Sequence, residues 1–493
     1  MHLPLGTFSP DAKIGLVSAS RNCFPRSLSE DRMNKLHAAC HTVGVPCILP
    51  EGDCRVIETK DHARRAAQQL EEAGCDGVVL YLGNFSPEIE DAVFAKSMSC
   101  PVMIIAAAEE SAASLARNRG DALCGMLSAC MAIRRRGVIS NVHIPEHPLV
   151  SATSGAQAVK RFARIVKIVK GLRNATLGLY GPRPRDFETC NYNVSALGSI
   201  GVEVEEHSFL DLLHEVEHAR QSEDCKAVIA QMRKELPQTP GDDFMKRLAA
   251  YEVAILALRE RLGLSGMTTQ CWTEQEMALK HVPCYVNARM AARGFPVACE
   301  NDAYSLTAEL LGQYASDQGV TILDINHSIP ADLAPSLADY PLEDLAGFFH
   351  CGNTDPRRLA NPAMKHQVIM HRLMEPDSAP DITRGTIEGQ IAASPITVLQ
   401  VQGAGDDLCA CLCEGQFLDL DPKTFGATGT AYLPGFRRFY RHVLLGRFHH
   451  HAAVAFEHVG GLAYDALKLL GVKQVFVPLG DRPLYEGENP FGA

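Results

Sequence analysis

The sequence predicts an α/β protein with two Rossmann-like parallel-sheet domains followed by a β-rich, barrel-like C-terminal domain. The chain has 493 residues, more than one hydrophobic core usually holds, so two or three domains are expected. Up to about residue 315, apolar runs are separated by amphipathic segments, which is typical of parallel strands covered by helices. Beyond that point, short segments are separated by Gly, Pro and Asp, which is typical of antiparallel sheets and barrels.

We expect the three domains at 1–172, 173–315 and 316–493. In the first, "KIGLVS" and "DGVVLYLG" read as buried strands, and "AVKRFARIVKIVKGLRN" as the closing helix. In the second, "FMKRLAAYEVAILALRERLG" predicts a long helix that Gly263 ends. In the third, segments such as "GVTILDI", "PITVLQVQG" and "HAAVAF" predict short strands between turns.

The composition argues against several kinds of partner. The formal net charge is -11, with 47 Lys and Arg against 58 Asp and Glu, whereas nucleic-acid binding rewards an excess of cations. No apolar run approaches the roughly 20 residues that span a bilayer, so no membrane association is expected. The first residues lack the basic start and apolar core of a secretory signal. With 17 cysteines in so long a chain, we expect reduced thiols in the cytoplasm rather than a disulfide scaffold.

Acidic side chains follow two successive predicted strands of the second domain. Glu274 lies in "QCWTEQEM" and Asp302 in "VACENDAY", each where a predicted strand gives way to a helix. The helix between the two strands makes them parallel, and ligands of open α/β sheets bind at the carboxyl edge. On neighbouring strands, about 4.8 Å apart, the two carboxylates would repel unless a divalent cation lay between them. The alternative is that Asp302 only caps its helix, which stabilises by about 1 kcal/mol.

Histidines supply the other predicted ligands. "GRFHHHAAVAF" contains His449, His450 and His451 at the start of a predicted strand, on which His449 and His451 share one face. "GFFHCGN" places His350 at the end of another apolar segment. Imidazole beside carboxylates suits Mn²⁺, Fe²⁺ or Co²⁺ better than Ca²⁺. The alternative for the triplet is a turn of polar side chains.

In chain order, "QCWTEQEM", "VACENDAY", "FFHCGN" and "HHHAAVAF" resemble motifs of the L-fucose isomerase and L-arabinose isomerase superfamily. "SASRNCFPRSL" and "LYGPRPRDFETC" resemble two further loops of that family, so the resemblance covers essentially the whole chain. It implies an aldose–ketose isomerase with two Rossmann-like domains and a β-rich domain. The implied substrate is a pentose or 6-deoxyhexose-like sugar, and the implied cofactor is Mn²⁺ or another divalent transition metal. The implied assembly is a homo-oligomer, a trimer or a hexamer.

The resemblance also implies a metal set. Glu274 and Asp302 match the family's two carboxylates, which would move a proton between C1 and C2 through an enediol intermediate. His451 matches the metal-binding histidine, with His450 as the alternative. His350 sits where arabinose isomerases supply a further ligand.

Substrate contacts are implied in two loops and in the His run. Arg183 and Glu188 lie in "GPRPRDFET". The alternative is that this loop has only a structural role, because prolines stiffen a loop at the end of a strand. Arg21, in the corresponding loop of the first domain, would reach the site of a neighbouring subunit. His450 is the remaining implied contact. Thr273 stands where many relatives have Pro, which leaves the identity of the sugar open.

Two alternatives to an isomerase remain at this point. One is a non-catalytic sugar-binding protein on the same scaffold, since fold does not dictate function. The other is a metal-dependent epimerase or lyase, because a stabilised enediolate can react in several ways. Only catalysis needs both Glu274 and Asp302. A nicotinamide enzyme is disfavoured, because no G-x-G-x-x-G follows the first predicted strand.

Overall fold

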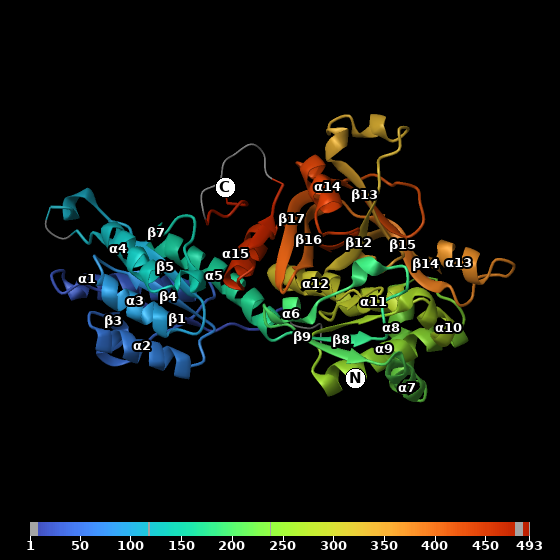
Figure 1. Ribbon diagram of the computed structural model, residues 1–493, viewed down its shortest axis with the longest axis horizontal. Helices are drawn as coiled ribbons and strands as arrows, with labels where there is room; N and C mark the ends of the chain where they lie inside the picture. Colours follow the sequence, from blue (N-terminus) through green and yellow to red (C-terminus); the bar gives the residue numbers. More distant parts are fainter. Residues whose placement is uncertain (1–7, 117–118, 237, 479–486, 493) are drawn as a thin grey trace. The chain divides into compact units, whose positions relative to one another are not determined.

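The computed structural model describes residues 8–116, 119–236, 238–478 and 487–492, which form two compact units (Figure 1). The smaller, N-terminal unit is built mainly from residues 10–170, together with the segment 462–471. The larger unit is built mainly from residues 171–461. Every residue that the site below depends on, apart from Arg21, belongs to the larger unit.

The N-terminal unit is a parallel sheet with helices, as the sequence predicts. Its strands pair in the order β2-β1-β4-β5-β6, with β3 on β1 and β7 on β5, and all these pairs are parallel. The central strands are buried at every position, which explains their unbroken apolar sequences. The elements are β1 (Ile14–Ala19), α1 (Arg26–Thr42), β2 (Cys47–Ile48), β3 (Val56–Ile57), α2 (Lys60–Glu72), β4 (Gly77–Leu82), α3 (Glu88–Ser97), β5 (Val102–Ala107), α4 (Ala122–Arg135), β6 (Val142–His143), β7 (Leu149–Val150) and α5 (Ala152–Arg173).

Asp91 on α3 gives this unit a measurable pH dependence. Its carboxyl group is fully buried and accepts a hydrogen bond from Ser86 Oγ. Burial raises the pKa of Asp91 from 3.8 to about 7, so between these values the folded chain holds a proton that the unfolded chain has lost. Stability therefore falls as pH rises through this window, by up to about 1.4 kcal/mol per pH unit.

We expect Asp91→Asn to remove this part of the slope and to be more stable than the unsubstituted protein near pH 8. Thermal unfolding from about pH 5 to about pH 8 measures the effect. Asp61→Asn is the matched control, because the Asp61 side chain is 75% exposed, and it should keep the original slope. Identical slopes for Asp91→Asn and the unsubstituted protein would contradict the prediction.

The first part of the larger unit is a second parallel sheet, in the order β11-β10-β8-β9. As predicted, the two strands that precede the acidic motifs are parallel neighbours, with Met267 opposite Val297 and Thr268 opposite Ala298. Gly263, with φ 65°, ends the long helix α9 as predicted. The elements are β8 (Thr176–Tyr180), α6 (Val194–Gly198), β9 (Glu203–His207), α7 (Phe209–Ala219), α8 (Asp224–Glu235), α9 (Asp242–Leu262), β10 (Gly266–Thr269), α10 (Glu276–Leu279), α11 (Cys284–Ala291) and β11 (Val297–Ala298).

The β-rich region is a closed barrel with extensions, which confirms the barrel-like prediction. Among the described strands, β18, β13, β12, β19, β16 and β17 pair antiparallel in that order, and β17 pairs back onto β18 to close the ring. The elements are β12 (Thr321–His327), β13 (Leu345–His350), β14 (Leu359–His366), α13 (Val368–Met374), β15 (Arg384–Ile391), β16 (Ser394–Ala404), β17 (Asp407–Phe417), β18 (Ala427–Tyr432), α14 (Phe436–Leu445), β19 (His451–Ala455), α15 (Gly460–Leu469) and β20 (Gln474–Phe476).

Helix α12 (Ala303–Ser316) joins the parallel sheet to the barrel. All of its residues are buried, because it contacts β16 and β19 of the barrel on one side and β10 and β11 of the sheet on the other (Figure 1). A helix covered on both sides has apolar residues on both faces, as α12 has, and its buried polar residues are Ser305, Thr307, Glu309, Gln313 and Ser316. Its N-terminus therefore lies where the carboxyl edge of the sheet meets the barrel.

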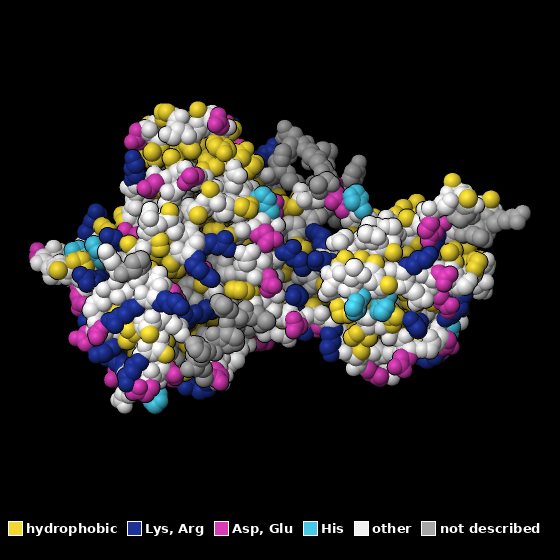
Figure 2. All heavy atoms as spheres, turned by 180° about the vertical axis from the view of Figure 1, so that it is seen from behind, with side chains coloured by type: hydrophobic (Ala, Val, Ile, Leu, Met, Phe, Trp, Pro, Cys, Tyr) yellow, Lys and Arg dark blue, Asp and Glu magenta, His cyan; other side chains and the backbone are white. Residues whose placement is uncertain are grey.

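The surface carries charges of both signs. Figure 2 shows Lys and Arg side chains interspersed with Asp and Glu side chains on the visible face of each unit. No helix among the described residues is long and apolar enough to cross a membrane.

Candidate metal centre

A left-handed turn connects β11 to α12 and carries the acidic motif. Glu300 and Asn301 have φ 52° and 58°, a backbone conformation that costs a side-chain-bearing residue about 1–2 kcal/mol. The turn is held by the Asn301 backbone N–H, which donates to Thr269 O at 3.1 Å, and by Asn301 Nδ2, which donates to Gly181 O at 2.6 Å. Hydrogen bonds to the end of β10 and to the residue that follows β8 thus support the strained turn. It presents Glu300 and Asp302 to the barrel.

Three strands of the barrel provide the side chains that face Glu300 and Asp302. His451 begins β19 and lies opposite Asp324 of β12, while His350 ends the next strand, β13. His451 Nδ1 lies 2.8 Å from Asp302 Oδ2, and its Nε2 lies 3.2 Å from Glu300 Oε2. The same Nε2 lies 3.7 Å from Asp324 Oδ1. His451 is therefore the centre of the cluster, with a carboxylate on each ring nitrogen.

The donor set fits a divalent transition metal. One ligand atom each from Glu300, His350 and His451 lies within 4.8 Å of the others, and all three residues are buried. One carboxylate with two imidazoles is a set that Mn²⁺, Fe²⁺ and Co²⁺ accept. Of the side chains that the structure describes, His350 Nδ1 is buried without a hydrogen-bond partner, and the buried Glu300 Oε2 and Asp324 Oδ1 share one neighbouring nitrogen, His451 Nε2. A bound cation would satisfy such atoms, which are otherwise costly to bury.

The electrostatics of the cluster favour one added positive charge. Burial opposes a charge on His451, but hydrogen bonds to Asp302, Cys190 and Glu300 outweigh it and raise its pKa well above the usual value. Burial also opposes ionisation of Asp302 and Glu300, yet the neighbouring histidines keep the pKa of both carboxyl groups below their usual values. Protonated His451 thus occupies the electrostatic role that a cation would take.

The two carboxylates predicted from the sequence lie in different surroundings. Asp302 caps α12, accepting from Ser305 N at 2.9 Å and from Ser305 Oγ at 2.6 Å, and it also bonds His451. Asp302 therefore both caps α12 and contacts His451, so the two roles do not exclude each other. Glu274 lies in the short helical turn η5 (Cys271–Gln275) after β10, half-buried, and its Oε2 has no hydrogen-bond partner within the described chain. It belongs to none of the close ligand groups found among the described residues.

The predicted substrate contacts are placed apart from one another. Glu188 and His450 line a cavity of about 660 Å³, together with His449 and part of α14. Arg183 instead braces its own loop, donating from Nε to Asn191 Oδ1 at 2.7 Å and from its guanidinium to two backbone carbonyls of the loop. It lines a separate cavity of about 790 Å³.

Arg21 belongs to the N-terminal unit. Its guanidinium donates to Ser86 O at 3.0 and 3.2 Å and lies 4.1 Å from the centre of the Phe85 ring. These contacts hold the two loops at the end of β1 and β4 together. The predicted contact of Arg21 with a neighbouring subunit's site stays a prediction.

The fold brings three residues to the cluster for which the sequence predicts no ligand role: Glu300, Asp324 and Cys190. Glu300 was visible beside Asp302, but which of the two faces His350 is set by the left-handed turn. Asp324 is an acid inside the buried strand "TILDI", a signal that a polar partner is needed. Cys190 lies with Asp302 and His451 in a second close group and has no sequence signal of its own.

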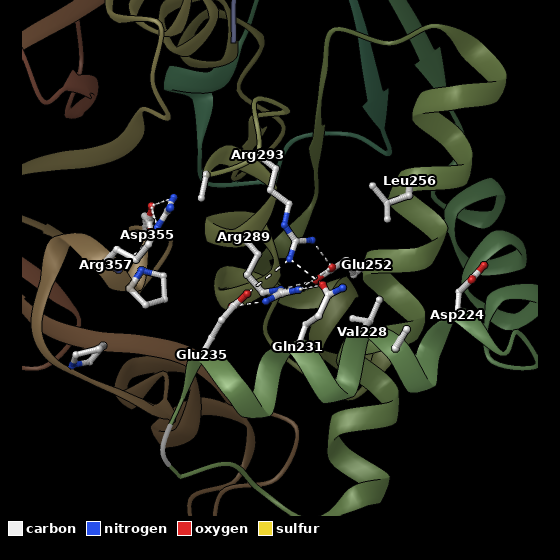
Figure 3. Close-up of a pocket in the computed structure, with 14 residues that line it drawn as sticks. Asp224, Val228, Gln231, Glu235, Glu252, Leu256, Arg289, Arg293, Asp355 and Arg357 are labelled. Atoms are coloured by element: carbon white, nitrogen blue, oxygen red, sulfur yellow. Dashed lines mark hydrogen bonds and ion pairs between the residues drawn. The ribbon is translucent and has the colours of Figure 1, made fainter. Parts of the chain in front are cut away.

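Figure 3 shows a different cavity, of about 490 Å³, between α8, α9, α11 and the segment after β13. Arg289, 2% exposed, donates to both carboxylate oxygens of Glu252 at 2.6 and 3.0 Å and also pairs with Glu235. Arg293 donates to Glu252 Oε1 at 2.6 Å. Since these arginines already have carboxylate partners, the network fixes α9 to α11 rather than presenting free cations.

We expect Glu252→Gln to lower the free energy of unfolding by about 3–5 kcal/mol, because Arg289 would stay buried without its main counter-charge. Denaturant unfolding measures the loss. Glu223→Gln is the matched control, since the Glu223–Lys226 pair is exposed and should contribute little. A Glu252→Gln effect as small as that of the control would show that the network does not stabilise the unit.

The comparisons with known protein families place the chain in a class. Residues 15–173 match the family model described as fucose/sulfoquinovose isomerase, N-terminal domain. Residues 348–476 match the one described as L-fucose isomerase, C-terminal domain. Such domains are those of sugar isomerases that interconvert aldoses and ketoses. The chain is a fucose isomerase-like protein and belongs to that family. A search of curated proteins found no match.

Proposed function

We propose that this protein is a divalent-metal-dependent aldose–ketose isomerase, acting on a pentose or 6-deoxyhexose-like sugar through an enediol intermediate. The matched domains support a sugar isomerase. Metal dependence is supported by the buried group of Glu300, His350 and His451, whose ligand atoms lie within 4.8 Å of one another. Mn²⁺ is the ion we propose, because one carboxylate with two imidazoles suits it.

The proposed chemistry divides the work between residues of the cluster. When bound, the metal would act as a Lewis acid, polarising the sugar's carbonyl group and stabilising the negative charge of the enediolate. Glu300, His350 and His451 would hold it. Asp302 would accept a hydrogen bond from His451 Nδ1–H, so that Nε2 faces Glu300.

Glu274 is the group that we propose to move the proton. Its Oε2 is buried, and no described group donates to it, so it is free to take a proton from one sugar carbon and return it to the next. The predictions that Asp302 shares this proton transfer and that Glu274 and Asp302 also bind the metal stay predictions. The lowered pKa of Asp302, and its two bonds to Ser305, count against it as a proton carrier.

The sugar would bind in the cavity of about 660 Å³ beside His449 and His450, a volume typical of small-ligand sites. Burial lowers the pKa of His450 to about 4, so its imidazole is neutral and can both donate and accept hydrogen bonds. Glu188, on the opposite loop, can accept from sugar hydroxyls. A homo-oligomer, trimer or hexamer, is part of the proposal and is measured by light scattering.

The experiment is a panel of aldoses, incubated in D₂O with metal-free protein and with Mn²⁺ added. We expect a ketose product only with metal, carrying solvent deuterium at the carbon that receives the proton. NMR locates the deuterium. Product formation by metal-free protein, at the rate seen with Mn²⁺, would contradict metal dependence.

The same experiment separates the alternatives. A sugar-binding protein would shift sugar resonances on binding but give no product with any metal. An epimerase would place deuterium at a carbon whose configuration inverts, and a lyase would release two smaller carbonyl compounds. Any of these outcomes would replace the isomerase proposal.

A further inference from the structure

A thiol-lined cavity lies directly beside the candidate metal centre. Its lining includes Cys271, Cys284, Cys299 and Cys351, together with Glu300 and His350 of the centre itself. The cysteines come from four separate places: the turn after β10, the start of α11, the turn after β11 and the end of β13. The cysteine cluster "CACLC" visible in the sequence is instead core packing within β17.

Three groups in this cavity have the geometry of a metal site. The Sγ atoms of Cys271 and Cys299 and a carboxylate oxygen of Glu300 lie within 4.8 Å of one another, and all three residues are buried. Cys271 Sγ lies 3.6 Å from Glu300 Oε1 and accepts the Glu300 backbone N–H at 3.4 Å. Two sulfur ligands of a tetrahedral zinc ion, each at about 2.3 Å, are about 3.8 Å apart. Ligand atoms within 4.8 Å of one another are compatible with such an ion.

A fourth group points to a ligand independently. Glu276, 1% exposed, lines the same cavity, and its Oε2 has no hydrogen-bond partner in the described parts of the chain. A carboxylate oxygen buried in this way is costly unless a proton or a cation satisfies it. The two thiols decide which ion suits the group, because thiolates favour Zn²⁺ and similar soft ions over Mn²⁺.

We propose that Cys271, Cys299 and Glu300 form a second metal site, which takes a thiophilic ion such as Zn²⁺ or Cd²⁺. On binding, two S–H bonds break and two metal–sulfur bonds form, two protons leave to solvent, and no electrons are transferred. Glu300 is shared with the Glu300–His350–His451 group. A thiophilic ion therefore withdraws a ligand from the metal of the isomerase and inhibits it, a consequence that rests on the proposed function.

The binding test uses Cd²⁺ alone with the full-length, metal-free protein. Titration should give near-ultraviolet thiolate-to-cadmium absorption that saturates, and Cys299→Ala should lose this saturating band. Cys284→Ala is the matched control, because Cys284 lines the same cavity but lies outside the three-residue group, so it should keep the band. Absence of a band, or a band that Cys299→Ala keeps, would overturn the site.

The inhibition test compares rates with and without Cd²⁺ for each Mn²⁺-loaded variant. We expect about tenfold inhibition or more for the unsubstituted protein and for Cys284→Ala, and much less for Cys299→Ala. Equal inhibition of all three proteins would overturn the competition for Glu300.

The two tests also separate this site from the proposed function. If no sugar is isomerised, the proposed function fails, while the absorption test still decides whether the site exists. If isomerisation occurs but the band is absent, the function stands and the site fails.

Discussion

Replacement of Glu300 by Gln is expected to remove the divalent metal and, with it, isomerase turnover. Glu300 supplies the carboxylate of the group that it forms with His350 and His451, and a neutral amide oxygen binds a transition-metal cation weakly. Loss of an outer-shell partner alone typically costs about 10–100-fold in metal affinity, so loss of this ligand should cost more than about 100-fold. Gln has nearly the size of Glu and the same backbone preferences, so the turn should persist.

Metal content after desalting, and turnover against Mn²⁺ concentration, measure this effect. Glu309→Gln on α12 is the matched control. Glu309 is 2% exposed, and burial raises its pKa well above the usual value, which favours the uncharged carboxyl group. Glu309 belongs to none of the close ligand groups among the described residues, so this variant should keep its metal. A Glu300→Gln protein that binds Mn²⁺ as tightly as the Glu309→Gln control would refute the assignment of the ligand.

The order and direction of the strands around the site follow from local sequence. The strand predicted around 266–269, the helix after it and the short strand at 297–298 predict a parallel pair, because such crossovers are right-handed and return to the same sheet. The structure has that pair in register. Gly263 ends α9 in the left-handed conformation, for the steric reason that made it a predicted helix end.

The ligand geometry depends on contacts that no local pattern contains. Glu300 and Asp302 are two residues apart, and both carboxylates reach His451, Asp302 at Nδ1 and Glu300 at Nε2, across the left-handed backbone of Glu300 and Asn301. That backbone is held by Thr269, at the end of β10, and by Gly181, directly after β8. Similarly, Asp324 reaches His451 only because β12 and β19 pair across more than a hundred residues. The sequence therefore predicts which segments meet at the site, whereas the contacts of each side chain there depend on the fold.

Glu274→Gln and Asp302→Asn are expected to impair the enzyme in different ways. The amide introduced by Glu274→Gln could not take a proton, so turnover should fall by about 10²–10⁴-fold while bound metal and stability stay near those of the unsubstituted protein. The side chain introduced by Asp302→Asn would still cap α12, because Asn is as good a cap as Asp. It would hold His451 less firmly, so metal affinity should fall by about 10–100-fold.

Turnover measured against Mn²⁺ concentration distinguishes the two roles. For Asp302→Asn the curve should shift to higher metal concentration and recover much of its plateau, because the side chain acts through His451 rather than on the sugar. For Glu274→Gln the plateau itself should fall, because no amount of metal supplies the missing proton acceptor. If Asp302→Asn instead loses its plateau, Asp302 carries a proton after all, and its bonds to Ser305 and His451 must break during the reaction.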